Sequence, residues 1–146
     1  MKKLEIKNKL INHIMINGEK KTSEKIVLDC FKELQKKNIK KTNELIKLAV
    51  ISSTPIFKLH TIKNKKSKKR KVKEIPAFIT NTSYRISLAI KFIINSIGRK
   101  KESFYNKLNK EILLNSQQKG EAVQLKNNLQ QKALVKKKYL KFYRWK

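Results

Sequence analysis

The chain has 146 residues and a formal net charge of +28, from 38 Lys and Arg against 10 Asp and Glu. This length predicts one domain large enough to bury a core, and no apolar stretch is long enough to cross a membrane. The charge predicts a working state bound to a polyanion, with nucleic acid as the first candidate and an anionic membrane surface as the second, because a free monomer would repel itself.

Cysteine and histidine are too few for a disulfide framework or a metal site. Cys30 is the only cysteine, and His13 and His60 lie far apart in the sequence. We expect Cys30 to be a buried thiol and His13 to have a structural or surface role. The carboxylates are scattered, no nucleophile has an obvious base, and there is no glycine-rich phosphate loop. We therefore expect no catalytic residue, no metal, no cofactor and no enzymatic activity.

Three helices are predicted in the first third of the chain. Apolar residues at helical spacing predict the first over residues 4–17. Thr22 or Ser23 is expected to cap the second helix, and Thr42 or Asn43 the third.

The helical spacing of apolar residues does not continue into residues 55–79, which we name the arm. Residues that favour β structure predict a strand from Ile56 to Ile62 and a return strand from Val72 to Ile79. Pro76 restricts the second strand to an edge or bulged position. Between Lys63 and Lys73, eight of eleven residues are Lys or Arg, so this tip must be solvated or neutralised from outside. No Asn-Gly or Gly-Gly pair indicates a tight turn, and a disordered basic loop is the alternative.

Three more helices are predicted after the arm. The first starts at Thr82 or Ser83 and ends at Gly98, and its continuous isoleucine-rich stripe predicts a central position in the core. Another follows Ser103 and ends by Gly120, and the last starts near residue 121 and becomes more basic towards its end. The sequence therefore predicts a mostly α, single-domain protein over residues 1–146, with about six helices and a protruding two-stranded β-hairpin arm.

RNA binding is the function that these residues favour, because Lys and Arg neutralise phosphates without reading bases. Aromatic residues beside cations, such as Tyr84 beside Arg85 and the segment 142–145, either stack on bases or pack against the body. The candidate RNA-binding residues lie in the arm, at helix ends and in the basic C-terminal part: Lys20, Lys21, Lys63, Lys65, Lys66, Lys68, Lys69, Arg70, Lys71, Lys73, Arg85, Arg99, Lys100, Lys101, Lys136, Lys137, Lys138 and Arg144.

Two alternatives to RNA binding remain open. A DNA-binding or nucleoid-type protein would carry the same charge, since runs of Lys do not distinguish RNA from DNA. A membrane-surface protein would present an amphipathic helix to lipid. Several apolar stripes occur in this one chain, and burying them against one another is the simpler arrangement, so we expect no membrane partner.

Four segments in order along the chain resemble one protein family. They are IMINGEKKTSEKIV at 14–27, YRISLAIKFI at 84–93, QKGEAVQLKNNL at 118–129 and YRW at 143–145. Together they resemble small-subunit ribosomal protein seven of the bacterial and organellar type.

The resemblance implies a helical body with a protruding β-arm that binds small-subunit rRNA and organises the head of the subunit. It implies neighbouring head and platform proteins as partners, and an arm near the mRNA path and the exit-site tRNA. Lys20, Arg85 and Arg144 match basic positions of the family. Glu19 stands where the family usually has Lys, the arm lacks paired glycines, and contacts made by the family's longer tails are expected to be absent or replaced.

Residue usage indicates where such a protein is made. Of the basic residues, 34 are Lys and four are Arg, and Ile and Asn are abundant, as an AT-rich coding genome would produce. The N-terminal segment lacks the features of a secretory signal or a transit peptide. We expect a mitochondrial ribosome and an organelle-encoded chain, with a plastid or an AT-rich bacterium as alternatives.

Overall fold

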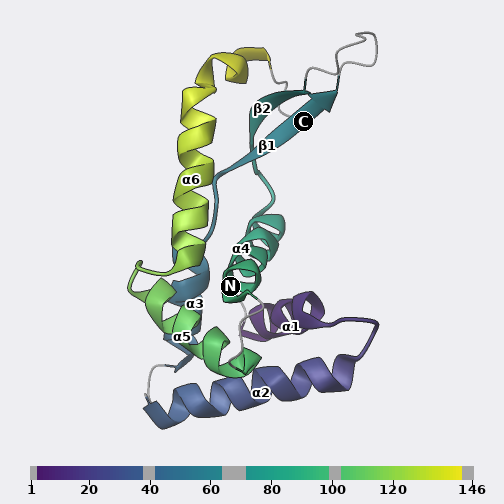
Figure 1. Ribbon diagram of the computed structural model, residues 1–146, viewed down its shortest axis with the longest axis vertical. Coiled ribbons are helices and arrows are strands. Elements are labelled where there is room, and N and C mark those ends of the chain that lie inside the picture. Colours follow the sequence, from purple (N-terminus) through teal and green to yellow (C-terminus); the bar gives the residue numbers. More distant parts are fainter. Residues whose placement is uncertain (1–2, 38–41, 64–71, 99–102, 143–146) are drawn as a thin grey trace.

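The computed structural model describes residues 3–37, 42–63, 72–98 and 103–142 (Figure 1). Within these ranges the chain forms three helices, two strands, three further helices and a final short 3-10 helix. The elements are α1 (Lys3–Ile14), α2 (Lys20–Lys37), α3 (Thr42–Ser52), β1 (Phe57–Lys63), β2 (Val72–Phe78), α4 (Thr82–Ile97), α5 (Phe104–Ser116), α6 (Glu121–Val135) and η1 (Lys137–Phe142). The predicted fold class, a mostly α domain with six helices and a two-stranded hairpin, is confirmed.

Helix α4 occupies the centre of the helical body, as its apolar stripe predicts. It packs against α1, α3, α5 and α6 (Figure 1). Its buried residues recur every three or four positions: Ile86, Ala89, Ile90, Ile93 and Ile97. That spacing places all five on one face of the helix, where they join apolar residues of the other five helices in a single core.

The first two helices differ from the predictions at the turn between them. Helix α1 ends at Ile14, earlier than predicted, because the chain turns through positive φ at Asn17 (54°) and Gly18 (80°). Helix α2 begins at Lys20, so the predicted caps Thr22 and Ser23 lie inside its first turn. Ser23 is buried there and its hydroxyl donates to the Lys20 carbonyl at 2.8 Å, an alternative to capping that Ser commonly adopts.

The junction between α5 and α6 also differs from the prediction. Helix α5 ends at Ser116, and Gly120 is the residue that precedes α6 rather than the end of α5. A Cβ on residue 120 would lie 2.1 Å from Asn115 Oδ1. Beside it, the carboxylate of Glu111 accepts hydrogen bonds from the Ala122 backbone N–H at 2.9 Å and from Asn115 Nδ2 at 3.0 Å. Gly120 is therefore required for close packing between the two helices.

The two predicted strands form, each within a residue or two of its predicted bounds. They pair antiparallel from Phe57 opposite Phe78 to Lys63 opposite Val72. At the base of the arm, the two Phe rings lie with their centroids 4.4 Å apart. Strand β1 contacts α6 and β2 contacts η1, so the arm and the C-terminal end of α6 lie side by side and extend from the same end of the body (Figure 1). The predicted basic tip between the strands, residues 64–71, lies outside the described residues.

Candidate nucleic-acid interface

Two of the predicted RNA-binding residues lie at the start of α2. Lys20 and Lys21 are both exposed in the first turn of this helix. The Lys20 ammonium lies 3.7 Å from Glu24 one turn later, and the Lys20 side chain is 68% exposed. An ion pair this exposed is weak, so Lys20 remains accessible to an anion in solution.

Arg85 lies in the first turn of α4, at the foot of the arm. Its side chain is half-buried, and its Nε–H donates to the backbone carbonyl of Pro55 at 3.1 Å. This bond joins the start of α4 to the residue where the chain enters the arm. The sequence predicts Arg85 as an RNA-binding residue, and the structure gives it a second role in holding the arm's base.

Lys136, Lys137 and Lys138 follow the end of α6. Lys136 is half-buried and forms an ion pair and hydrogen bond with the carboxylate of Glu74 in β2. This hydrogen bond, together with the charge of Lys136, holds the pKa of Glu74 below its ordinary value. Lys137 and Lys138 are exposed. Of these three cations, Lys136 connects α6 to the arm, and the other two are accessible to solvent.

The other predicted residues lie at the ends of the strands or outside the described ranges. Lys63 is opposite Val72 in the strand pairing, and Lys73 is opposite Ile62, so both lie at the end of the paired part of the arm. The residues outside the described ranges are Lys65, Lys66, Lys68, Lys69, Arg70, Lys71, Arg99, Lys100, Lys101 and Arg144.

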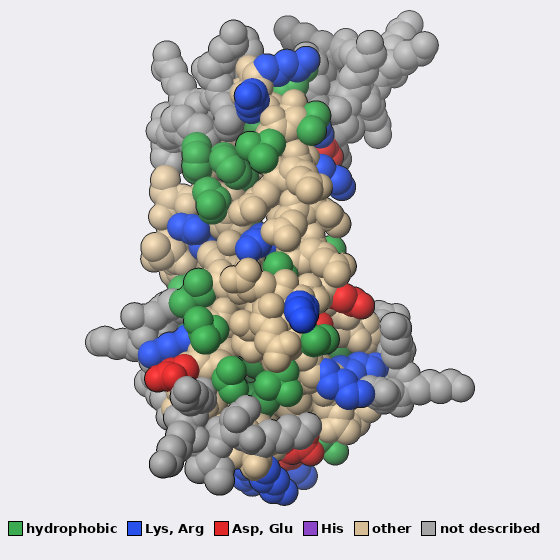
Figure 2. Space-filling view, turned by 90° about the vertical axis from the view of Figure 1, so that its left-hand side faces the viewer, with side chains coloured by type: hydrophobic (Ala, Val, Ile, Leu, Met, Phe, Trp, Pro, Cys, Tyr) green, Lys and Arg blue, Asp and Glu red, His purple; other side chains and the backbone are tan. Residues whose placement is uncertain are grey.

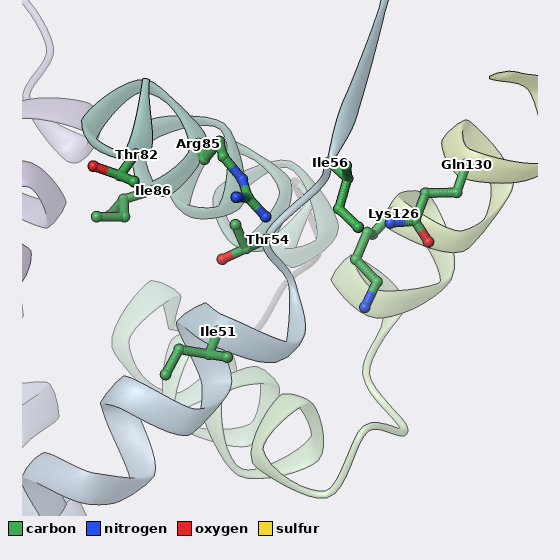
Figure 3. A pocket seen from close by; sticks show the side chains of 8 residues that line it. All are labelled: Ile51, Thr54, Ile56, Thr82, Arg85, Ile86, Lys126 and Gln130. Atoms are coloured by element: carbon green, nitrogen blue, oxygen red, sulfur yellow. The ribbon is translucent and has the colours of Figure 1, made fainter. Parts of the chain in front are cut away.

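The structure also contains a pocket that no sequence pattern predicts, which we name the arm-base pocket. It has a volume of about 500 Å³ and opens where the end of α3, the start of β1, the first turn of α4 and the middle of α6 meet (Figure 3). Its lining residues are Ile51, Thr54, Ile56, Thr82, Arg85, Ile86, Lys126 and Gln130. Lys126 and Gln130 are four residues apart, a spacing that indicates one helix face, but nothing local shows that Arg85 lies opposite them.

The surface beside α6 is basic, with few acids. Figure 2 faces this side and shows Lys and Arg side chains spread along its length, with few acidic side chains among them. The chain contains no acid after Glu121. Apolar residues are exposed on the same helix, with Leu134 58% and Val135 81% exposed. In the ranges that the structure describes, no helix is both long and apolar enough to cross a bilayer.

Comparison with known proteins decides the family. The family model described as Ribosomal protein S7p/S5e matches residues 2–137. The chain belongs to this family. It is therefore a structural ribosomal protein and not an enzyme, and the resemblance seen in the four sequence segments is confirmed.

Three relatives of this S7p/S5e family member cover most of its length. Small ribosomal subunit protein uS7m of Reclinomonas americana is 30% identical over 94% of this chain and 83% of the relative. Small ribosomal subunit protein uS7 of Wigglesworthia glossinidia brevipalpis is 32% identical over 97% of this chain and 87% of the relative. Small ribosomal subunit protein uS7c of Euglena longa is 31% identical over 82% of this chain and 66% of the relative.

Proposed function

We propose that this protein is a structural constituent of the small ribosomal subunit that binds small-subunit rRNA and organises the subunit head. One observation carries the proposal beyond family membership. The paired strands and the end of α6 extend side by side from the body (Figure 1), so Lys63 and Lys73 at the end of the strand pairing lie at the same end of the molecule as residues 136–138. Cations gathered in this way suit a surface of closely spaced phosphates.

The mechanism that we propose is electrostatic. Exposed lysines, including Lys20, Lys21, Lys137 and Lys138, neutralise rRNA phosphates and release counterions. The helical core holds these side chains in a fixed arrangement, and Arg85 and Lys136 hold the arm's base against α4 and α6. Lys136 would contact RNA only by exchanging Glu74 for a phosphate.

The remaining proposed contacts extend from the family resemblance. The arm would lie near the mRNA path and the exit-site tRNA, and neighbouring head and platform proteins would pack against the body. The whole chain, residues 1–146, would act as one domain. The abundance of Lys, Ile and Asn, as an AT-rich genome would encode, favours a mitochondrial ribosome, although the relatives uS7m, uS7 and uS7c are similarly identical at 30, 32 and 31% and do not favour one compartment.

The test is the salt dependence of binding to a transcribed head-domain fragment of small-subunit rRNA. Replacing Lys137 and Lys138 with Ala should lower the slope of log K against log salt by about 2, one for each phosphate that is no longer neutralised. Lys36 on α2 and Lys91 on α4, both exposed, form the matched control, because Lys36→Ala/Lys91→Ala removes the same charge at sites that are not proposed to contact RNA.

The two double variants separate the possible results. An unchanged slope in the first variant, or an equal fall in both, would remove the α6 end from the RNA interface. Equal affinity of the unmodified protein for duplex DNA and for the rRNA fragment would favour the alternative, a DNA-binding or nucleoid-type protein.

A further inference from the structure

The arm-base pocket has a wall of isoleucines. Ile86 is buried, whereas Ile51 is 59% exposed and Ile56 is 42% exposed at the mouth of the pocket. Its volume of about 500 Å³ lies in the range of about 300–1,000 Å³ that is usual for small-ligand sites. An exposed apolar surface in a cavity of this size suits a flat, partly apolar group.

Three polar side chains of the pocket, Arg85, Lys126 and Gln130, can donate further hydrogen bonds. The Arg85 Nε–H donates to the Pro55 carbonyl, and among the described residues its four other guanidinium N–H groups have no partner. Lys126 donates to the carbonyl of Ser52, and an ammonium has two more N–H groups. Gln130 adds an amide with both a donor and an acceptor. None of the lining residues that the structure describes is acidic, so the pocket favours an anion.

We propose that the arm-base pocket receives one unpaired nucleotide of the rRNA. Its base would lie against Ile51, Ile56 and the guanidinium of Arg85, and its phosphate near Lys126. Unpaired bases are recognised in this way, by stacking on planar or apolar side chains and by hydrogen bonds along their edges, which Gln130 can supply. The proposal rests on the proposed function, rRNA binding, and adds to it an interaction that depends on shape as well as on charge.

A protein segment is the other occupant that an apolar pocket could take. Because Arg85 and Lys126 line the pocket without a described acid beside them, such a segment would have to carry a carboxylate next to an apolar side chain. A nucleotide carries the flat base and the anion on one residue, and Arg85 and Lys126 approach the pocket from opposite sides, α4 and α6 (Figure 3). The charge and shape of the pocket together favour the nucleotide.

The decisive variant fills the pocket without changing the charge. Ile51→Trp places an indole at the mouth, on a side chain that is already 59% exposed, so the fold should tolerate it. The dissociation constant for the transcribed head-domain rRNA fragment should rise about 10-fold, as removal of one stacked base would give. The salt slope should fall by about 1 at most, for the single phosphate placed near Lys126, because the variant itself removes no cation.

Leu48→Trp is the matched control, because Leu48 is 51% exposed on the same helix and is not part of the pocket lining. It should bind the fragment as the unmodified protein does. If Ile51→Trp loses helicity by circular dichroism, Gln130→Ala replaces it, with exposed Gln124→Ala on the same helix as its control.

Each result has a distinct meaning. Equal affinities for the pocket variant and its control would overturn the nucleotide proposal and leave rRNA binding intact. Failure of the unmodified protein to bind the fragment would overturn the proposed function and this proposal with it. Normal binding of Ile51→Trp to rRNA combined with its absence from sedimenting subunits would mean that a protein segment fills the pocket, which also overturns the proposal.

Discussion

The buried carboxylate of Glu111 holds α6 against α5, and its removal tests the junction that the sequence did not predict. Glu111 is 8% exposed, and its Oε1 accepts from the Ala122 N–H at 2.9 Å and from Asn115 Nδ2 at 3.0 Å. Glu111→Ala leaves both buried donors without that acceptor, at a cost of about 1–3 kcal/mol each. A carboxylate at a helix N-terminus adds about 0.3–1 kcal/mol. We expect the free energy of unfolding to fall by about 2–7 kcal/mol, a large part of the roughly 5–15 kcal/mol typical of a domain.

Urea denaturation followed by far-ultraviolet circular dichroism measures this destabilisation. Glu121→Ala is the control, because Glu121 is an exposed acid in the first turn of the same helix and should contribute only through the helix dipole, at most about 1 kcal/mol. Glu111→Gln keeps one carbonyl acceptor and should lie between the two. Equal destabilisation by Glu111→Ala and Glu121→Ala would refute the reasoning, because it would show that charge, and not the two hydrogen bonds, makes the difference.

Three further predictions follow from burial and from the arm's ion pair. Ile93→Ala should lower the free energy of unfolding by about 2–5 kcal/mol, because Ile93 is 1% exposed in the core. Leu48→Ala should lower it much less, because the Leu48 side chain is 51% exposed. Similar destabilisation by both variants in urea would mean that the buried faces are misassigned. Burial raises the pKa of the Cys30 thiol to about 12, so iodoacetamide should alkylate it only after denaturation, and prompt alkylation of the native chain would contradict its burial. Because Lys136 lowers the pKa of Glu74, the pair should stabilise the fold above the ordinary carboxyl pKa of 4.5 and lose this effect as pH falls through the lowered pKa. The melting temperature of Glu74→Gln should therefore not show this decrease at acidic pH. Melting temperatures of the two proteins that change in parallel with pH would count against the pair.

Most of the helical body could be predicted because its signal is repetitive. The stripe of α4 repeats over sixteen residues, so several positions agree on one buried face and an error at one of them changes little. The strands were also predictable, because β-forming residues on both sides of a basic segment fit a hairpin. Those features depend on neighbours close in sequence, which are visible without a structure.

Helix ends were predicted less well, because a single residue has several uses there. Ser23 could cap a helix or donate back to the preceding turn, and the structure shows the second. A glycine can end a helix through positive φ or make room for a neighbour, and Gly120 does the latter, facing Asn115 and Glu111. The choice depends on side chains from the previous helix, whose position the local sequence does not specify.

The candidate site was also hard to predict, because its contacts join residues that are far apart in the sequence. Composition locates cations but not the groups that they bind, and the partners of Arg85 and Lys136 lie 30 and 62 residues away in the sequence. The sequence predicts both simply as RNA-binding residues. The arm-base pocket was missed for this reason too, since its lining comes from four elements that only the fold brings together.

Two cations with partners at the arm, Arg85 and Lys136, explain how so basic a chain can hold the arm against the body. Like charges close together repel, and a basic arm with no attachment would turn away from the basic end of α6. Lys136 opposes that repulsion by pairing with Glu74, and Arg85 fixes the entry to the arm through the Pro55 carbonyl. Because these two bonds are internal, they attach the base of the arm to α4 and to the end of α6 without any RNA. In the proposed function, exposed cations such as Lys137 and Lys138 would neutralise phosphates, so positioning and neutralisation would be assigned to different side chains of the same basic surface.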